Sequence, residues 1–170
     1  AIDDFVEVFD FRTFDLDRDG VADTEGTYSV GIRIYREAAF DNLIGFFAVD
    51  PVDGSIGGVA PSAANREAYI QAALDNLLFS AQETQNNDVT PFTIPNVEAG
   101  SVILPLLISN SAAANADFSN VYLPFISLNS DRADHIRSLG NGIFGIEDLP
   151  GGGDQDFDDI IVQITTVDLA

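Results

Sequence analysis

The chain lacks four residue types entirely, since its 170 residues include no cysteine, no lysine, no methionine and no tryptophan. The absence of cysteine excludes disulfides, thiolate metal sites and cysteine nucleophiles. Without lysine, the seven basic residues are all arginines, and against 28 acidic residues they leave a formal net charge of -21. A field of this sign repels phosphate backbones and attracts cations, so we expect no nucleic-acid partner.

Long apolar runs are also missing. No stretch approaches the roughly 18 apolar residues of a membrane span, so we expect no membrane insertion. Hydrophobic residues nevertheless make up 46% of the chain, which excludes a disordered acidic tail and supplies a core. No internal repeat or linker divides the sequence. We therefore expect a single domain over residues 1–170.

Short segments of apolar and polar alternation predict strands. Phe5–Phe14 alternates, and Tyr28, Val30, Ile32 and Ile34 share one face of a second segment. The run "LIGFFAV" is apolar on both faces and is typical of a buried strand. Further strands are expected in "SVILPLLIS", "VYLPFISL", "GIFGIEDL" and "DIIVQITTV", with Pro105 and Pro124 indicating edges or bulges.

One segment has the period of a helix instead. Between Pro61 and Gln82, apolar residues recur at Tyr69, Ala73, Leu77 and Ala81, which predicts one amphipathic α-helix over this range. Many short strands with a single helix favour a mainly β fold. We expect an antiparallel β-sandwich, jelly-roll-like, with the helix on its side or in a long crossover.

The stretch "LPGGGDQDFDD" places four aspartates within six residues, directly before an apolar run. Carboxylates ~5 Å apart repel each other by roughly 3 kcal/mol per pair at an effective dielectric of ~20. A solvated acidic turn would avoid that cost, but the three glycines favour a loop that converges on a cation. Oxygen ligands in number select Ca²⁺. The candidate ligands are Glu147, Asp148, Asp154, Asp156, Asp158 and Asp159.

A second acidic stretch, "DLDRDGVAD", matches the first half of the calcium loop D-x-D-x-D-G. The match ends at position twelve, where Gly26 replaces the glutamate of an EF-hand, and the flanks are strand-like rather than helical. We expect a calcium loop on a β scaffold, the alternative being an ordinary Asp-rich turn. The candidate ligands are Asp15, Asp17, Asp19, Asp23 and the carbonyl of Val21.

Signals of catalysis are weak. His135 is the only histidine, and no G-x-S-x-G elbow accompanies it, so a hydrogen-bonded structural histidine is favoured. A paired-carboxylate glycosidase would need one distinctive acidic pair, and none stands out. The chain also has no tryptophan to form a sugar platform. We expect no enzymatic activity and no catalytic residues.

The segment "NSDRADHIRSLGNGIFGIEDLPGGGDQDFDDIIVQI" resembles the signature of a family known as domain of unknown function 4114, found in large secreted bacterial and cyanobacterial proteins. "YREAAFDNLIGFFAVD" resembles an upstream block of that family. Asp158 stands where asparagine is usual, and Ile146 where phenylalanine is. The resemblance implies a β-rich secreted module and assigns no activity. The matching residues are Asp134, His135, Arg137, Gly145, Glu147, Asp148, Gly151, Gly152, Gly153, Asp154, Asp156, Phe157 and Asp159.

Together these patterns predict a non-enzymatic, calcium-binding structural or adhesive module that is secreted or lies at the cell surface. Two alternatives stay open. The strand-like segments "DDFVEVFDF" and "IIVQITTV" permit a surface-layer or filament subunit that self-assembles by strand addition. A calcium-dependent carbohydrate-binding module, with surface glycans as partners, would draw its stacking residues from Tyr28, Tyr35, Tyr69 and Tyr122.

Overall fold

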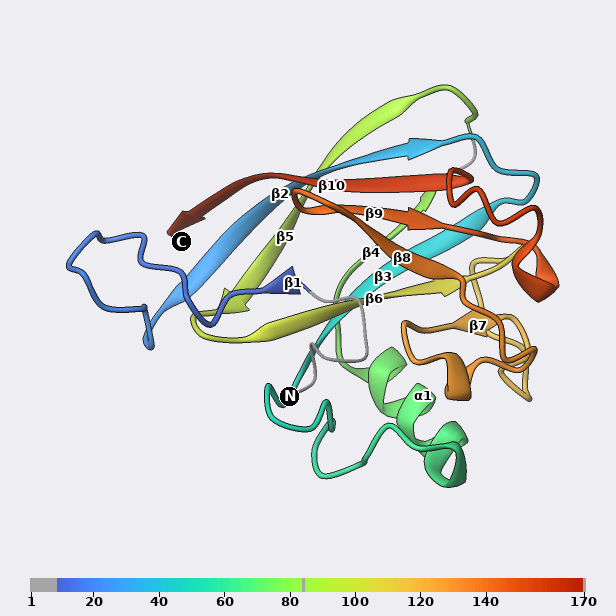
Figure 1. Cartoon of the computed structure of the whole chain (residues 1–170), viewed down its shortest axis with the longest axis horizontal. Helices are drawn as coiled ribbons and strands as arrows, with labels where there is room; N and C mark the ends of the chain where they lie inside the picture. Colours follow the sequence, from blue (N-terminus) through green and yellow to red (C-terminus); the bar gives the residue numbers. More distant parts are fainter. Residues whose placement is uncertain (1–8, 84, 170) are drawn as a thin grey trace.

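The computed structural model describes residues 9–83 and 85–169, which form two antiparallel sheets packed face to face (Figure 1). The first sheet has the order β1-β6-β3-β4, with β7 also paired to β6, and the second has the order β5-β2-β10-β9-β8. The strands are β1 (Phe9–Asp10), β2 (Thr27–Arg36), β3 (Asn42–Val49), β4 (Leu77–Glu83), β5 (Val89–Glu98), β6 (Val102–Ile108), β7 (Val121–Tyr122), β8 (Ile136–Gly140), β9 (Ile143–Ile146) and β10 (Ile160–Leu169). The predicted mainly β sandwich is confirmed.

Helix α1 (Arg66–Asp75) follows a 3-10 turn at Ala63–Asn65 and packs on the outer face of the first sheet (Figure 1). Tyr69, Ile70 and Ala73 are its buried residues. Two further 3-10 turns lie at Ile126–Leu128 and Pro150–Gly152. Within the described residues, no helix is long and apolar enough to cross a membrane.

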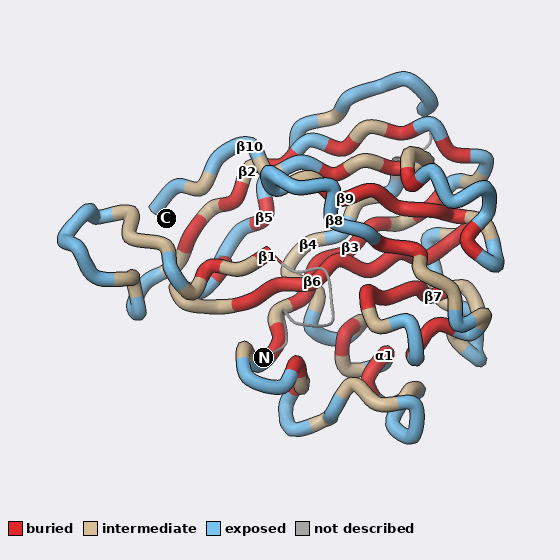
Figure 2. The backbone as a smooth tube through the Cα atoms, viewed as in Figure 1, coloured by how far each residue is buried: buried red, intermediate tan, exposed pale blue. Residues whose placement is uncertain are grey.

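The main core lies between the sheets, and a second apolar cluster lies between the first sheet and α1 (Figure 2). On β2, Tyr28, Val30, Ile32 and Ile34 are all buried, which confirms the face predicted from their alternation. The first sheet is covered on both sides, so β6 is buried along its whole length. This explains why "LIGFFAV" and "VILPLLI" are apolar without alternating.

The predicted helix over residues 61–82 is wrong in its second half. The helix ends at Asp75, and Leu77–Glu83 is strand β4, in which Phe79 pairs with Phe46 of β3. Asp75 and Asn76 are poor helix formers, and the residues beyond them gain partners in the sheet. The apolar spacing of this segment fits either structure, so pairing with β3 decides it.

Other strand boundaries also differ from the prediction. The sequence patterns predicted neither β5 nor β8 as a strand. β7 ends two residues before Pro124, which fits the breaker role of proline. Pro105 is opposite Phe46 on one side of β6. On the other side, β1 and β7 pair with Ile103 and Leu107, and no strand among the described residues pairs with Pro105.

The expected strand at Phe5–Phe14 falls partly outside the described residues. Of its described part, residues 9–14, only Phe9–Asp10 is strand. The carbohydrate-binding alternative named four tyrosines as possible stacking residues, and three of them are not available on the surface. Tyr28, Tyr69 and Tyr122 are buried in the core, since their rings supply apolar area there, and cannot stack on an external sugar. Tyr35 alone is partly exposed.

Candidate metal centres

The first candidate centre joins the end of β9 to the start of β10. Glu147, Asp154 and Asp156 each offer a carboxylate oxygen, and these three atoms lie within 4.8 Å of one another. Glu147 directly follows β9, whereas Asp154 and Asp156 belong to the loop that leads into β10. Because β9 and β10 are neighbours in the second sheet, a loop of modest length brings the three carboxylates together.

The backbone of this loop is left-handed at five positions. Gly151, Gly152 and Gly153 have φ values of 77°, 85° and 52°, as the predicted convergence of the loop requires. Gln155 and Phe157 also have positive φ, 62° and 58°, at a cost of roughly 1–2 kcal/mol each for residues with a Cβ. The loop is thus held in a conformation that the packing around it must support.

Glu147 is the buried member of the cluster. Its side chain is fully inaccessible to solvent. One carboxylate oxygen, Oε1, accepts a hydrogen bond from the backbone N–H of Phe157. The other, Oε2, has no partner among the described residues and lies where a Cβ on Gly153 would come within 2.8 Å of it. Burial, together with the nearby carboxyl of Asp156, raises the pKa of Glu147 to about 8.

The other predicted ligands around the first centre occupy different places. Asp148 is buried and faces away from the cluster, with Oδ2 accepting from Phe40 N and Asn42 Nδ2, each at 3.0 Å. Asp159 accepts from the backbone N–H of Asp148, and burial raises the pKa of Asp159 to about 6. Hydrogen bonding to Asp156 raises the pKa of Asp158. Glu147, Asp154 and Asp156 are therefore the set that converges.

The second candidate centre is the loop before β2, where oxygen atoms of Asp15, Asp17 and Asp19 lie within 4.8 Å of one another. Asp15 accepts from the backbone N–H groups of Asp19 and Gly20, at 3.1 and 2.9 Å. Gly20 has a φ of 91°, the sharp turn for which glycine is needed in such loops. Backbone donors within the loop thus satisfy much of this cluster.

The last two predicted ligands of this loop do not join the three carboxylates. Asp23 turns inward, where its Oδ2 accepts from Leu16 N at 2.9 Å and from Tyr28 Oη at 2.7 Å. Burial, followed by this hydrogen bond, raises the pKa of Tyr28 to about 12. Val21 lies at the exposed tip of the loop, where its N–H donates to Asp19. Asp23 therefore anchors the loop to β2.

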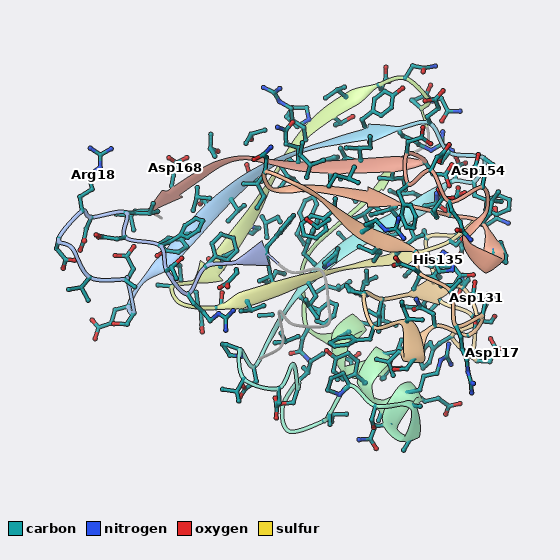
Figure 3. All side chains as sticks on the ribbon, in the orientation of Figure 1. Arg18, Asp117, Asp131, His135, Asp154 and Asp168 are labelled. Atoms are coloured by element: carbon teal, nitrogen blue, oxygen red, sulfur yellow. The ribbon has the colours of Figure 1, made fainter. Side chains whose placement is uncertain are left out.

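The two clusters lie at opposite ends of the long axis of the molecule. Figure 3 shows Arg18, which belongs to the loop before β2, at one end of the molecule, and Asp154 at the other end. The sandwich separates them, so an ion bound at one cluster does not share ligands with the other.

His135 connects the first centre to its surroundings. The histidine is fully buried and stacks on Tyr122, with ring centroids 3.6 Å apart. Its Nδ1 lies 2.9 Å from the carbonyl oxygen of Glu147, and its Nε2 lies 2.7 Å from Oδ2 of Asp131. That same oxygen accepts from Gly151 N at 2.7 Å. The hydrogen-bonded histidine expected from the sequence therefore holds the glycine-rich loop against the end of β9.

The role of Asp131 was not anticipated from the sequence. Its spacing of four residues from His135 was visible, but its bond to Gly151 spans 20 residues. Hydrogen bonds from Ala133, Gly151 and His135 outweigh partial burial and lower the pKa of Asp131. Asp131 is thus a charged anchor next to the first centre.

Comparison with known proteins identifies one family. Residues 97–166 match the family model "Domain of unknown function (DUF4114)". The matched range begins near the end of β5 and ends within β10, so it includes the first centre, Asp131 and His135. The upstream block at residues 35–50 lies before this range. No curated protein and no solved structure matches the chain. The similarity of this chain to the DUF4114 family, a domain of unknown function, therefore extends over residues 97–166.

Proposed function

We propose that the chain is a non-enzymatic, calcium-stabilised structural or adhesive module that acts outside the cell, with Ca²⁺ held by Glu147, Asp154 and Asp156. The observation that carries the proposal is the unpartnered oxygen Oε2 of Glu147, which is fully buried and converges with two further carboxylates. A buried carboxylate oxygen without a partner is costly, and a cation removes that cost.

The chemistry of the cluster favours calcium among metal ions. All three side chains offer hard oxygen atoms, and both nitrogens of the single histidine are already engaged by oxygen atoms. Extracellular calcium modules bind with Kd values of about 10⁻⁴ to 10⁻³ M, which suits the calcium concentration outside cells. An ion here would tie the end of β9 to the loop before β10 and so stiffen one end of the sandwich.

A second ion in the loop containing Asp15, Asp17 and Asp19 is part of the same proposal. The D-x-D-x-D-G spacing and the convergence of the three carboxylates support it. An ion at each end of the sandwich would let the module carry load along its long axis.

Thermal unfolding with calcium and with EDTA tests the proposal. At a hundredfold excess over Kd, one site adds about 2.7 kcal/mol, which corresponds to roughly 5–10 °C in Tm for a chain of this size. The double variant D154N/D156N should lose most of this gain. The matched control D88N/D168N removes two exposed carboxylates elsewhere and should retain it. Equal midpoints in calcium and EDTA would refute the proposal.

Assembly by strand addition is a second candidate, because the structure has an open strand edge. β10 pairs with β2 as far as Leu169, but with β9 only over Ile160 to Gln163 (Figure 1). Beyond Gln163, no described strand covers that edge of β10, so a strand of another copy could pair there. Negative-stain microscopy in calcium distinguishes the cases, since only monodisperse particles at every concentration would argue against assembly.

A further inference from the structure

A polar hollow lies beside the first metal centre and shares none of its carboxylates. Its volume is about 520 Å³, within the range of roughly 300–1,000 Å³ seen for small-molecule sites. Four separate segments line it: the turn before β3, the β6–β7 connection, the turn after Ile126–Leu128, and Pro150. The polar residues that line the hollow include Asn110, Ser111, Asn115, Ser119, Ser130 and Asp131.

The wall of this hollow is tied to the sheets by hydrogen bonds, one of which is buried. The backbone N–H of Asn110 donates to Oδ1 of Asn42 at 2.9 Å, and Ser109 Oγ donates to the carbonyl of Asp148 at 2.6 Å. Asn120 braces the connection by accepting from Asn115 N and donating to the carbonyl of Ser109. The polar groups are therefore held in place before any ligand arrives, which reduces the entropy lost on binding.

Several of these groups keep unused hydrogen-bonding capacity. The amide of Asn110 is on an exposed residue and makes no side-chain hydrogen bond to the described residues. The hydroxyl of Ser130 donates to the carbonyl of Ser119, which leaves its lone pairs free to accept. The lining therefore offers both donors and acceptors, as recognition of hydroxyl groups requires.

The charge of the lining restricts the class of ligand. Although the chain carries 28 acidic residues, the hollow is lined by one carboxylate, that of Asp131, and by no arginine. Asp131 is already engaged by three hydrogen bonds from Ala133, His135 and Gly151. An anionic ligand would find no cation in this lining, and a cationic ligand would find more charge elsewhere on the surface. The lining thus fits a neutral polar ligand.

We propose that this hollow binds a neutral saccharide. Phe40, which is partly exposed, lines the hollow and offers an apolar surface for the C–H face of a sugar ring. Tyr122 is buried against His135 and forms part of the floor. The amide and hydroxyl side chains hydrogen-bond the sugar hydroxyls. This site goes beyond the calcium proposal, since Glu147, Asp154 and Asp156 do not line it.

A glycan array of neutral and acidic oligosaccharides, followed by titration of the best neutral ligand by NMR, tests the site. The variant Asn110→Gly removes the amide while tolerating the positive φ of 56° at this position. It should weaken binding roughly tenfold, the equivalent of one hydrogen bond to a neutral partner. The matched control Asn141→Gly makes the same change at an exposed residue with a φ of 55°, away from the hollow, and should bind like the wild type.

A second variant, Ser130→Ala, removes one hydroxyl from another segment that lines the hollow and should also weaken binding. Unchanged thermal midpoints would show that the variants remain folded. The proposal is overturned if no neutral saccharide binds at about 1 mM, or if acidic glycans bind in preference. It is also overturned if Asn110→Gly and Ser130→Ala both bind as the wild type does.

Discussion

The backbone carbonyl of Phe157 lies directly against Gly145, so that a Cβ atom on Gly145 would come within 2.2 Å of the carbonyl oxygen. Gly145 is in the middle of β9, and Phe157 is the buried residue that follows the acidic loop. Arg137 of β8 lies over the Phe157 ring, 4.0 Å from its centroid. The loop that carries Asp154 and Asp156 is therefore seated on the sheet through Phe157.

The variant Gly145→Ala should lower the free energy of unfolding by about 2 kcal/mol or more, because a backbone atom must move to admit the methyl group. Gly45→Ala is a useful comparison, since its added Cβ would meet the flexible end of Leu77 at 2.8 Å. That side chain can rotate, so the cost should be smaller. Chemical denaturation of both variants measures the difference, and an equal or greater loss in Gly45→Ala would contradict the role assigned to Gly145.

The variant Asp131→Asn should destabilise the chain by about 2 kcal/mol or more. The carboxylate accepts from Ala133 N on one oxygen and from His135 and Gly151 on the other. Asparagine has one acceptor oxygen, so at least one of these donors would lose its partner, at about 1–3 kcal/mol for each buried group.

Asp134→Asn provides the control for this prediction, three residues away. Asp134 makes a surface ion pair with Arg137 at 3.2 Å, and such pairs contribute little, so the change should stay within about 0.5 kcal/mol. Thermal unfolding in EDTA compares the two variants without any contribution from calcium. Similar midpoints for both would show that the contacts of Asp131 do not hold the loop.

The calcium-free protein should lose stability as the pH rises from about 5 to about 8. Burial raises the pKa of Asp159 to about 6 and that of Glu147 to about 8, from ordinary values of 3.8 and 4.5. The folded chain therefore holds these protons more tightly than the unfolded chain, and this stabilisation disappears as each group ionises. Acids with lowered pKa values, such as Asp131, add a pH dependence only below about pH 5, where the unfolded chain takes up protons, and so do not oppose the trend above that pH.

Denaturation in EDTA between pH 5 and pH 9 measures this dependence. Glu147→Gln cannot ionise and should flatten the part of the curve above pH 6, whereas the exposed control Glu67→Gln should behave like the wild type. Saturating calcium should reduce the dependence, because the ion stabilises the ionised carboxylates. Stability of the wild type that is constant or increases over this range in EDTA would contradict the prediction.

Local patterns were sufficient to predict the sandwich, because burial of one face forces alternation. The face of β2 that contains Tyr28, Val30, Ile32 and Ile34 follows from this rule alone. The boundary between α1 and β4 could not be predicted in this way, since it depends on pairing with β3. β5 was also missed, because it is an exposed edge strand that contains prolines and little apolar alternation.

The two acidic motifs located both clusters, but the sequence did not identify which carboxylates converge. Glu147 and Asp148 are adjacent residues in an extended segment, so their side chains point to opposite sides, and only Glu147 reaches Asp154 and Asp156. This separation could have been inferred from the strand period. The unpartnered oxygen of Glu147 could not, because its burial depends on the packing of Gly153 and Phe157 after folding.

The loop before β2 offers the last test, because its cluster lies at the opposite end of the sandwich from Glu147. Asp17→Asn is the informative variant. Asp15 uses both oxygens to accept from Asp19 and Gly20, so changing it would disturb the loop itself. Asp17 accepts from the backbone N–H of Asp19 through Oδ1. Asparagine retains such an oxygen, so the variant removes the charged ligand while it keeps the loop hydrogen bond from Asp19.

Calorimetric titration should give two calcium ions per chain for the wild type and one for Asp17→Asn. Asp156→Asn should also bind one ion, and the combined variant none, because sites this far apart contribute independently. Glu25→Gln, an exposed change in the same loop, should retain both ions. If Asp17→Asn binds as many ions as the wild type, with the same affinities, the loop before β2 is an aspartate-rich turn stabilised by its own backbone, and calcium binding is confined to the end of the sandwich that contains Glu147.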